Sequence, residues 1–502
     1  MVKQALARVR FAGSLAAIRM NNPVKESSSP ACSQATSPRA WQAIVLSALA
    51  GGLGWGIRGQ YGHETGAMMA GALVGLTLVF LFCPGAPGLS AARAVAWCTI
   101  GIGFGGSMTY AQTIGLTHDA AMIGNAAALR WGMLGLALKG GIWIGFAGVF
   151  LGMGLSGVRY RPRELLALMA VLGALYFAGG WWLNQPFDPA HRILPRIYFS
   201  ADWRWRPDAV LKPRREDWGG LLLALMVLIG YAGGWRRDRL ARHLAGWAVL
   251  GGMVGFPLGQ CLQAYHAWHQ DAFRQGWWAG LDPLINWWNM METTFGAVMG
   301  GTIGLGLWLN RRHIAIAKDP NVSLSAPWEW GLVGVHMVLL TMSEFVPVRY
   351  VSKIVDVGLL MGVIPVVAVA GGRWWPYLLP LPITLFPIAG KTIRQLCYEE
   401  QALAPWAGWV VYGVVPMALA GWAAIWFARQ APGTLGGGTF ARRALALNAW
   451  LYFGLNYAFF HYPWPWTTWT ARTPNAVIYT LCALGLTGAA IWIHRRARTC
   501  ST

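Results

Sequence analysis

Arg58, His63 and Glu64 fall within seven positions of one another, between two long apolar segments. Only 12% of the 502 residues are charged, so ionisable side chains beside an apolar segment of bilayer length are costly and indicate a function. Arginine binds a carboxylate or phosphate through paired hydrogen bonds, and His63 beside Glu64 can exchange protons near neutral pH. We predict that this stretch binds an anionic solute or a proton. The alternative is an Arg–Glu pair that only holds a tight turn.

A second polar group follows the third apolar segment. It consists of Ser107, Thr109, Tyr110, Gln112, Thr113, His118, Asp119 and Asn125. Hydroxyls and amides on successive helical turns would line a polar path, with Gln112 on it, and His118 beside Asp119 suits a proton relay. Neighbouring residues on a helix do not face each other, so an ordinary loop is an equal alternative.

Two cations flank the next apolar run. Arg130 stands at its start, and Lys139 lies in its middle, within Leu-Ala-Leu-Lys-Gly-Gly. A cation at that depth needs a carboxylate partner or an anionic ligand. The candidate partners are Glu64, Asp119 and Glu292.

A third group fills the segment 265–294 with ionisable and aromatic residues. They are His266, His269, Asp271, Trp277, Trp278, Asp282, Asn286, Trp287, Trp288, Asn289 and Glu292. Tryptophan pairs are typical of a membrane interface, and the alternative is that Trp287 and its neighbours stack on sugar rings or a lipid headgroup. The His and Asp residues lack a fourth ligand at a recognisable spacing, and the zinc-protease pattern HExxH is absent after His63. We therefore expect no metal and no cofactor.

The elements that position these groups are apolar helices. Apolar residues make up 56% of the chain, which predicts an all-α polytopic membrane protein with about 14 transmembrane helices, the range being about 12 to 14. The apolar windows lie near 41–57, 66–83, 94–116, 131–155, 164–183, 218–235, 244–264, 295–310, 329–346, 354–371, 375–390, 406–428, 444–460 and 476–493.

Basic residues concentrate in alternate loops, which by the positive-inside rule predicts a bacterial-type inner membrane protein with both termini cytoplasmic. This pattern accounts for the net charge of +21, so no nucleic-acid partner is expected. Residues 1–40 are basic and serine-rich and are expected to form a disordered cytoplasmic tail. The seven cysteines form no CxxC pair, so neither a disulfide framework nor a metal cluster is expected.

The chain contains a faint internal repeat. Residues 51–60 resemble 251–260, and 66–73 resemble 296–303, in glycine and alanine positions. Two parallel six-helix halves, 41–236 and 244–428, followed by two extra helices in 444–493, would explain the likeness, as in transporters built from parallel repeats. Chance matches in a glycine-rich chain are the alternative. In the second copy Leu258 replaces Arg58.

These features predict a multi-pass secondary transporter for an anionic or polyhydroxylated small solute, with proton coupling through the His/Glu pair. The predicted binding residues are Arg58, His63, Glu64, Gln112, His118, Asp119, Arg130, Lys139, Trp287 and Glu292. The alternative is an integral-membrane glycosyl- or acyltransferase acting on a lipid-linked or periplasmic glycan, with His63, Glu64, Asp282 and Glu292 as catalytic residues. No ATP-binding loop GxxxxGK[ST] occurs in the chain, so ATP-driven pumping would need a partner.

Overall fold

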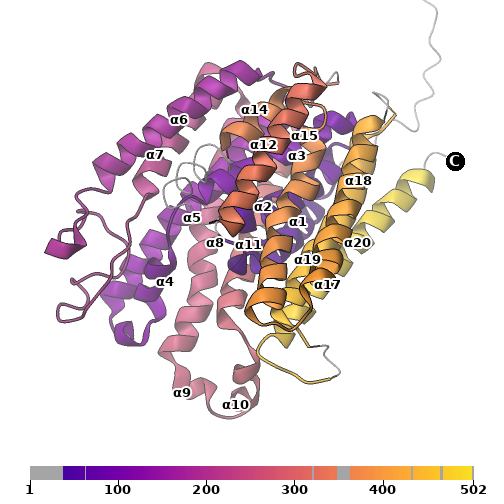
Figure 1. Cartoon of the computed structure of the whole chain (residues 1–502). Coiled ribbons are helices and arrows are strands. Elements are labelled where there is room, and N and C mark those ends of the chain that lie inside the picture. Colours follow the sequence, from indigo (N-terminus) through magenta and orange to yellow (C-terminus); the bar gives the residue numbers. More distant parts are fainter. Residues whose placement is uncertain are drawn as a thin grey trace, which may run out of the picture.

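The computed structural model describes residues 38–62, 64–318, 321–346, 362–430, 434–463 and 467–499. Helices are the only regular elements in these ranges, apart from the isolated bridges Pro87–Gly436 and Asp188–Ile193. The all-α prediction is therefore confirmed for the described part of the chain. Figure 1 shows the helices packed around a central group that contains α1, α2 and α11.

The helices before residue 236 are α1 (Ala40–Gly56), η1 (Arg58–Gln60), α2 (Glu64–Phe82), α3 (Gly88–Gly105), α4 (Ala111–His118), η2 (Ala120–Met122), α5 (Ala126–Leu155), α6 (Pro162–Leu183), η3 (Pro189–His191), α7 (Trp218–Ile229) and η4 (Gly230–Trp235). Those that follow are α8 (Arg239–Trp268), α9 (Gln270–Phe273), α10 (Trp278–Leu281), η5 (Asp282–Leu284), α11 (Trp287–Leu309), η6 (Arg311–His313), α12 (Ala326–Phe345), α14 (Ile364–Gly371), α15 (Trp375–Leu378), η8 (Leu379–Ile383), α16 (Thr384–Ile393), η9 (Arg394–Glu399), α17 (Pro405–Gly408), η10 (Trp409–Val414), α18 (Val415–Arg429), α19 (Gly437–Phe460) and α20 (Thr473–Thr499).

Seven helical segments in the described ranges are long and apolar enough to cross a bilayer. They are Glu64–Phe82, Ala126–Leu155, Pro162–Leu183, Trp218–Trp235, Arg239–Trp268, Pro405–Arg429 and Thr473–Ile493. Each coincides with one of the windows predicted from the sequence. The chain is therefore a helical, membrane-embedded protein, although seven segments are fewer than the predicted 14.

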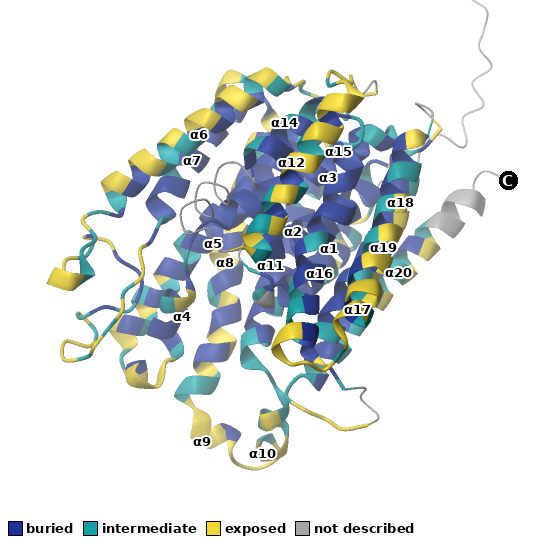
Figure 2. Cartoon of the chain, in the orientation of Figure 1, coloured by how far each residue is buried: buried dark blue, intermediate teal, exposed yellow. Residues whose placement is uncertain are grey.

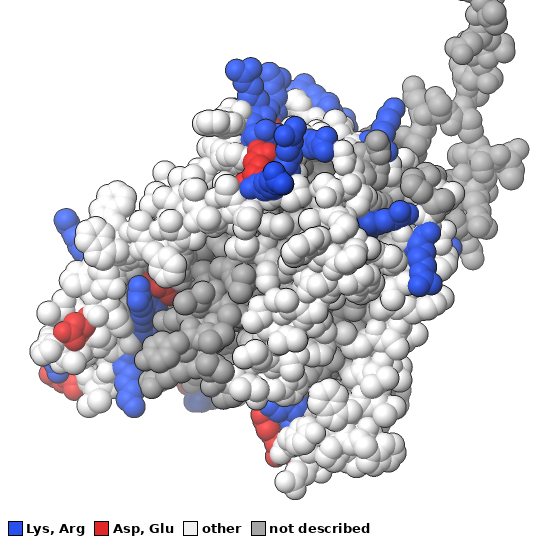
Figure 3. Space-filling model, turned by 45° about the horizontal axis from the view of Figure 1, so that its top comes forward, with Lys and Arg blue, Asp and Glu red and all other residues white. Residues whose placement is uncertain are grey.

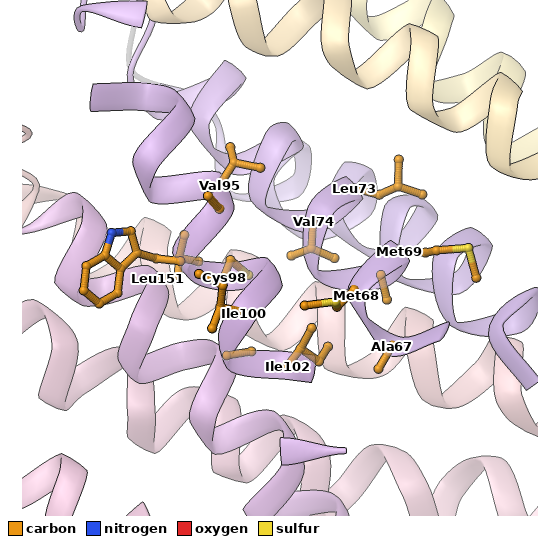
Figure 4. Packing of buried hydrophobic residues seen from close by; sticks show 14 of the residues in the cluster. Ala67, Met68, Met69, Leu73, Val74, Val95, Cys98, Ile100, Ile102 and Leu151 are labelled. Atoms are coloured by element: carbon orange, nitrogen blue, oxygen red, sulfur yellow. The ribbon is translucent and has the colours of Figure 1, made fainter. Parts of the chain in front are cut away.

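Burial separates an inner group of helices from an outer one. In Figure 2 the central helices are almost entirely buried, whereas α6, α12 and α18 show exposed residues along their length. Many of the exposed side chains on the outer helices are large and apolar, such as Phe177 at 66% and Trp422 at 68%. Apolar side chains in such positions suit contact with lipid tails. Inside, Met68 and Val74 of α2 pack beside Ile102 of α3, as Figure 4 shows.

Small residues bring α1 and α11 into close contact. A Cβ on Gly300 would lie 2.2 Å from the Ser47 carbonyl oxygen, and one on Gly304 would lie 2.2 Å from the Ala43 carbonyl oxygen. Gly296 meets Gly51 in the same way. Small residues at four-residue spacing allow two helices to approach this closely in lipid. This contact fixes the position of Arg58 just beyond the end of α1 relative to Glu292, one turn before Gly296.

The predicted span 94–116 is wrong as a single helix. α3 ends at Gly105, and α4 begins only at Ala111, after a non-helical segment. Glycines at 103, 105 and 106 favour this break because glycine is a poor helix former. Non-helical backbone inside a membrane protein occurs where it is buried in protein or lines a polar space. The break places the Tyr110 side chain next to Arg58.

The proline-rich window predicted at 375–390 is helical but irregular. α15, η8, α16 and η9 follow one another from Trp375 to Glu399, and η8 and η9 are π-helical. Proline removes backbone donors and leaves carbonyl groups without intrahelical partners. The Pro380 carbonyl instead accepts hydrogen bonds from Asn448 Nδ2 at 2.7 Å and Tyr452 Oη at 3.2 Å.

The basic loops gather on one face of the helix bundle. Arg93 donates to the Gly372 carbonyl at 2.8 Å, and the Ala315 amide donates to the Leu155 carbonyl at 3.0 Å. Asp238 accepts a hydrogen bond from Ser156 Oγ at 2.6 Å. These contacts join loops that are far apart in the sequence. We call this surface the basic face, and Figure 3 shows Lys and Arg side chains concentrated along it.

Candidate functional site

Arg58 and Glu292 form an ion pair in the interior of the helix bundle. Arg58 Nη2 lies 3.0 Å from Glu292 Oε1, and both side chains are only 1% exposed. Arg58 belongs to η1 and Glu292 to α11, so the pair joins segments 234 positions apart in the chain. Taking two charges out of water is expensive, and a buried pair adds little net stability compared with apolar side chains of similar size. A buried pair in a membrane protein is therefore a candidate functional site.

Aromatic rings surround the Arg58 guanidinium group. Its Cζ lies 4.9 Å from the centre of the Trp55 ring and 5.2 Å from the centres of the Tyr110 and Trp143 rings. Arg58 also donates a hydrogen bond to the Tyr110 hydroxyl. Ring faces attract a cation, so this aromatic box favours the charged form of Arg58, as do the electrostatic interactions with Glu292 and Glu64.

The carboxylate of Glu292 is closely surrounded. A Cβ on Gly59 would lie 2.4 Å from Glu292 Oε2, so only glycine fits at this position without displacing the carboxylate. Asn289, one turn earlier on α11, donates to the Gly56 carbonyl at 3.3 Å and so ties α11 to the end of α1. Glu292 Oε2 itself is buried and accepts no hydrogen bond within normal distance from a described residue, although the Trp288 side chain also interacts with the carboxylate.

Further buried polar side chains extend the site towards α19 and α20. We call the set Tyr61, Asn456, Tyr462, Asn475 and Tyr479 the tyrosine–asparagine cluster. Tyr462 and Tyr479 interact electrostatically with Glu292, and Tyr61 interacts with Tyr462. Both amide atoms of Asn475 are buried without a hydrogen-bond partner among the described residues, and the buried side chain of Asn456 interacts with Tyr462. Unpaired buried polar atoms of this kind mark places that water, an ion or a ligand occupies.

Glu64 lies near this site but belongs to a second charged group. It begins α2, where a negative charge stabilises the helix dipole, and it interacts electrostatically with both Arg58 and Lys391. Lys391 also interacts with Glu344, which Arg394 approaches to 2.9 Å. A set of charged groups thus leads from Arg58 to the surface. His63 lies outside the described residues.

Lys139 has a different partner from those expected. Its Nζ lies 2.6 Å from Glu216 Oε1, and both side chains are 0% exposed. The prediction that Glu64, Asp119 or Glu292 pairs with Lys139 is therefore wrong. The physical reason is that the segment after residue 184 folds back onto α5 and carries Glu216 with it. That fold could not be inferred from helix patterns.

The surroundings of Lys139 and Glu216 satisfy both charges. Lys139 Nζ donates to the Thr109 carbonyl and to Thr113 Oγ1, each at 2.8 Å. Glu216 accepts from Ser200 Oγ at 2.8 Å and from the Phe199 amide at 3.0 Å. Lys139 thus binds the Thr109 carbonyl, which the break between α3 and α4 leaves without a helical partner. We call the Lys139–Glu216 pair the anchor, because it holds the backbone of this break in place.

Four other predicted residues lie apart from Arg58. Gln112 holds the folded-back segment, accepting from the Arg214 amide at 2.9 Å and donating to the Lys212 carbonyl at 3.0 Å. His118 bonds the Ile114 carbonyl of its own helix and lies 3.8 Å from Asp119, which is 57% exposed. Arg130 is exposed on α5 and donates to the Ala126 carbonyl at 3.2 Å.

Trp287 and Asp282 belong to a second group of polar contacts, at the start of α11. Asp282 Oδ1 lies 2.8 Å from His266 Nε2 and accepts a hydrogen bond from Trp287 Nε1 at 2.8 Å. The His266 and Trp287 rings are stacked, with centres 4.6 Å apart. The structure pairs Asp282 with His266 and Glu292 with Arg58, so it does not bring the two carboxylates into one group.

Sequence reasoning missed the aromatic box and the anchor. Trp55 lies three positions before Arg58, a spacing that places both on one side of a helical turn and was a usable signal. Trp143 and Glu216 lie far from their partners in the sequence, and no local pattern identifies them. The tyrosine–asparagine cluster comes mainly from the C-terminal helices, which appeared as plain apolar spans.

The chain matches no family model, no curated protein and no solved structure. The fold and the buried ion pairs define a helical, membrane-embedded protein with a polar site in its interior. Its function is therefore argued from that site.

Proposed function

We propose that the protein is a multi-pass inner-membrane secondary transporter for an anionic or polyhydroxylated small solute, coupled to protons. Both termini are cytoplasmic in this proposal, and the chain crosses the membrane about 14 times in two related halves. The lipid bilayer and the small solute are its partners, and no cofactor takes part.

One observation carries the proposal. The buried Arg58–Glu292 pair lies beside polar atoms without a hydrogen-bond partner among the described residues, namely both amide atoms of Asn475, while Glu292 Oε2 itself also accepts no hydrogen bond within normal distance. Such atoms are costly in a protein interior unless a ligand or water satisfies them. Amide, hydroxyl and guanidinium groups together are suited to hydroxyl and carboxylate groups of a small solute.

Proton coupling follows from the chemistry of the pair. When Glu292 takes up a proton, it no longer holds Arg58 by charge, and the guanidinium group becomes available to an anionic solute. When the solute leaves, the proton also leaves and the ion pair forms again. Glu64 and Lys391 supply charged groups between this pair and the surface, which suits the passage of a proton.

The test is uptake by the full chain in proteoliposomes with an inward proton gradient. The probes are labelled succinate, inorganic phosphate and glucose, which cover the proposed solute classes. Wild type should accumulate at least one probe. Arg58→Ala should lower its uptake by about tenfold or more, the effect of losing one charge-assisted contact. Glu292→Gln should abolish accumulation but retain exchange of labelled for unlabelled probe.

Arg311→Gln is the matched control, since Arg311 is an exposed cation on the basic face. It should transport like wild type. Uptake of every probe at the level of empty liposomes, or normal accumulation by both site variants, contradicts the proposal. Size-exclusion profiles of the variants check that each is folded.

The contact between His266 and Asp282 favours a second candidate, a membrane transferase acting on a glycan. A carboxylate that orients a histidine is the usual arrangement of a general base, and Trp287 beside it offers a ring for stacking on sugar. His266→Ala separates the candidates: transport should be unchanged in this variant, whereas a transferase would lose its activity.

A further inference from the structure

A large cavity opens at the basic face, away from Arg58 and Glu292. Its volume is about 1010 Å³. Its walls come from the start of α3, the end of α5, the start of α6, residues 316–317 and 321–325, and the start of α12. The volume is at the upper end of the range for small-molecule sites, so the cavity can hold a ligand larger than a single phosphate ion.

Four arginines line this cavity: Arg93, Arg159, Arg161 and Arg163. The described residues that line it include no acid. Ser90, Asn321 and Ser323 add polar side chains, and Trp97 and Trp328 add aromatic ones. Arginine-rich pockets without acids attract anions, and guanidinium groups match phosphate oxygens in pairs.

Among the described residues, the acids nearest these walls are already engaged. Glu164 lies 3.3 Å from Arg236 Nε and accepts a hydrogen bond from Tyr231. Asp238 accepts hydrogen bonds from Ser156, Tyr160 and the Ala241 amide. Glu329 is buried, accepts from the Trp374 amide at 2.9 Å and interacts electrostatically with Arg93, whose charge it partly balances. The charges of Arg159, Arg161 and Arg163 therefore have no acid partner among the described residues.

Two further observations point to an anion. α6 has 22 residues and α12 has 20, and both begin at the cavity, where their N-termini carry partial positive charge that one acid in each first turn, Glu164 and Glu329, offsets in part. Arg93 uses one nitrogen to hold the Asn321 and Gly372 carbonyls, at 3.1 and 2.8 Å. Its Nε is buried and has no partner among the described residues.

We propose that this cavity is a binding site for a phosphate-bearing anion. Arg93 forms the fixed inner part of the site, and Arg159, Arg161 and Arg163 at its rim bind the phosphate oxygens. The aromatic and apolar walls contact the rest of the ligand. The same chemistry is offered by a phospholipid headgroup at the membrane surface and by a free phosphorylated metabolite. The site is separate from the proposed transport site and does not depend on it.

The experiment uses the full chain and two probes. Inorganic pyrophosphate is titrated into the protein in uncharged detergent by calorimetry. Separately, thermal unfolding is compared in nanodiscs of phosphatidylcholine with and without phosphatidic acid. The test variant is Arg159→Gln with Arg161→Gln and Arg163→Gln, all three exposed in the structure. The control is Arg311→Gln with Arg312→Gln, exposed cations of the same face that do not line the cavity.

A free phosphate ligand is identified if the triple variant binds pyrophosphate about tenfold or more weakly than wild type. The affinity of the control variant should stay within about twofold of wild type. A higher unfolding temperature with phosphatidic acid, lost only in the triple variant, identifies a lipid headgroup. Arg93→Lys keeps the positive charge but loses the paired hydrogen-bond donors of the guanidinium group. It should lower the affinity for whichever probe binds to wild type. The proposal is overturned if neither probe distinguishes wild type from the triple variant, or if the control loses as much as the triple variant.

Discussion

Two fully buried ion pairs lie among the described residues, and their surroundings differ. Lys139 and Glu216 lie 2.6 Å apart at 0% exposure, and hydroxyl, amide and carbonyl groups surround both. Arg58 and Glu292 lie 3.0 Å apart at 1% exposure, and aromatic rings cover the cation while one carboxylate oxygen has no hydrogen bond from a described residue. The two pairs are thus equally buried, but the polar atoms of Lys139 and Glu216 are more fully hydrogen-bonded than those of Arg58 and Glu292.

This difference separates an anchor from a candidate site. A network in which every polar atom is paired is rigid and has nothing left to offer a ligand. Lys139 and Glu216 fit that description, since they fix the break between α3 and α4. Arg58 and Glu292 lie where polar groups remain open. The two pairs are also linked, because Lys139 holds the Thr109 carbonyl one residue before Tyr110, whose hydroxyl contacts Arg58.

The largest expected effect is on stability, when one member of the anchor is removed. Lys139→Ala leaves Glu216 charged and buried, which should cost about 3–5 kcal/mol of unfolding free energy. Arg58→Ala should cost less, because the open polar atoms beside Glu292 mark a place where water or a ligand can solvate the carboxylate that is left. Thermal unfolding in detergent, with equal amounts of each purified variant, measures the loss of stability in Lys139→Ala and in Arg58→Ala. Equal losses in the two variants would erase the distinction between the pairs.

Neutral double variants sharpen the same test. Lys139→Gln with Glu216→Gln should recover most of the lost stability and keep transport, since neither charge is used for binding. Arg58→Gln with Glu292→Gln should also be stable but should not transport. Full transport by the second double variant would show that Arg58 and Glu292 serve structure alone.

Much of the fold was predictable from the sequence because it follows local patterns. Apolar windows located the seven spanning segments, each of which coincides with a window predicted from the sequence. The break after Gly105 was missed, because an apolar window counts hydrophobicity and does not detect a change in backbone direction.

The candidate site was predictable only in part. Arg58 was recognised as a costly charge and Glu292 as a binding residue, yet nothing local indicated that they pair across 234 positions. Glu216 was missed as the partner of Lys139 because the choice depends on how a long loop folds back. Asn456 and Asn475 were missed because single amides in apolar helices carry no spacing signal.

A smaller effect is expected from a methyl group beside Glu292. In Gly59→Ala the new Cβ would lie 2.4 Å from Glu292 Oε2, so the carboxylate must move away from Arg58. Overpacking of this kind costs about 1–3 kcal/mol, and transport should fall with it. Unfolding temperature and uptake are measured on the same preparation.

Gly280→Ala is the control, since a Cβ there meets nothing within 4 Å. It should behave like wild type in both measurements. If Gly59→Ala also behaves like wild type, the geometry of the ion pair is not critical for either stability or transport, and the contrast with the anchor fails.

The smallest effect on stability is expected at a surface ion pair, because water weakens the attraction between exposed charges. Glu400 Oε2 lies 2.5 Å from His461 Nε2, and the two side chains are 36% and 52% exposed. Hydrogen bonds from Gln395 and His461 lower the pKa of Glu400.

A carboxylate whose pKa is lower in the folded state than in the unfolded state stabilises the fold at pH values above the unfolded-state pKa. That stability is lost as the pH falls through the folded-state pKa. Exposed pairs contribute about 1 kcal/mol at most, so Glu400→Gln should shift the unfolding temperature only slightly at pH 7 and not at all at strongly acidic pH. A shift as large as that of Lys139→Ala would mean that burial does not set the strength of these pairs, and the comparison between anchor and site would lose its physical basis.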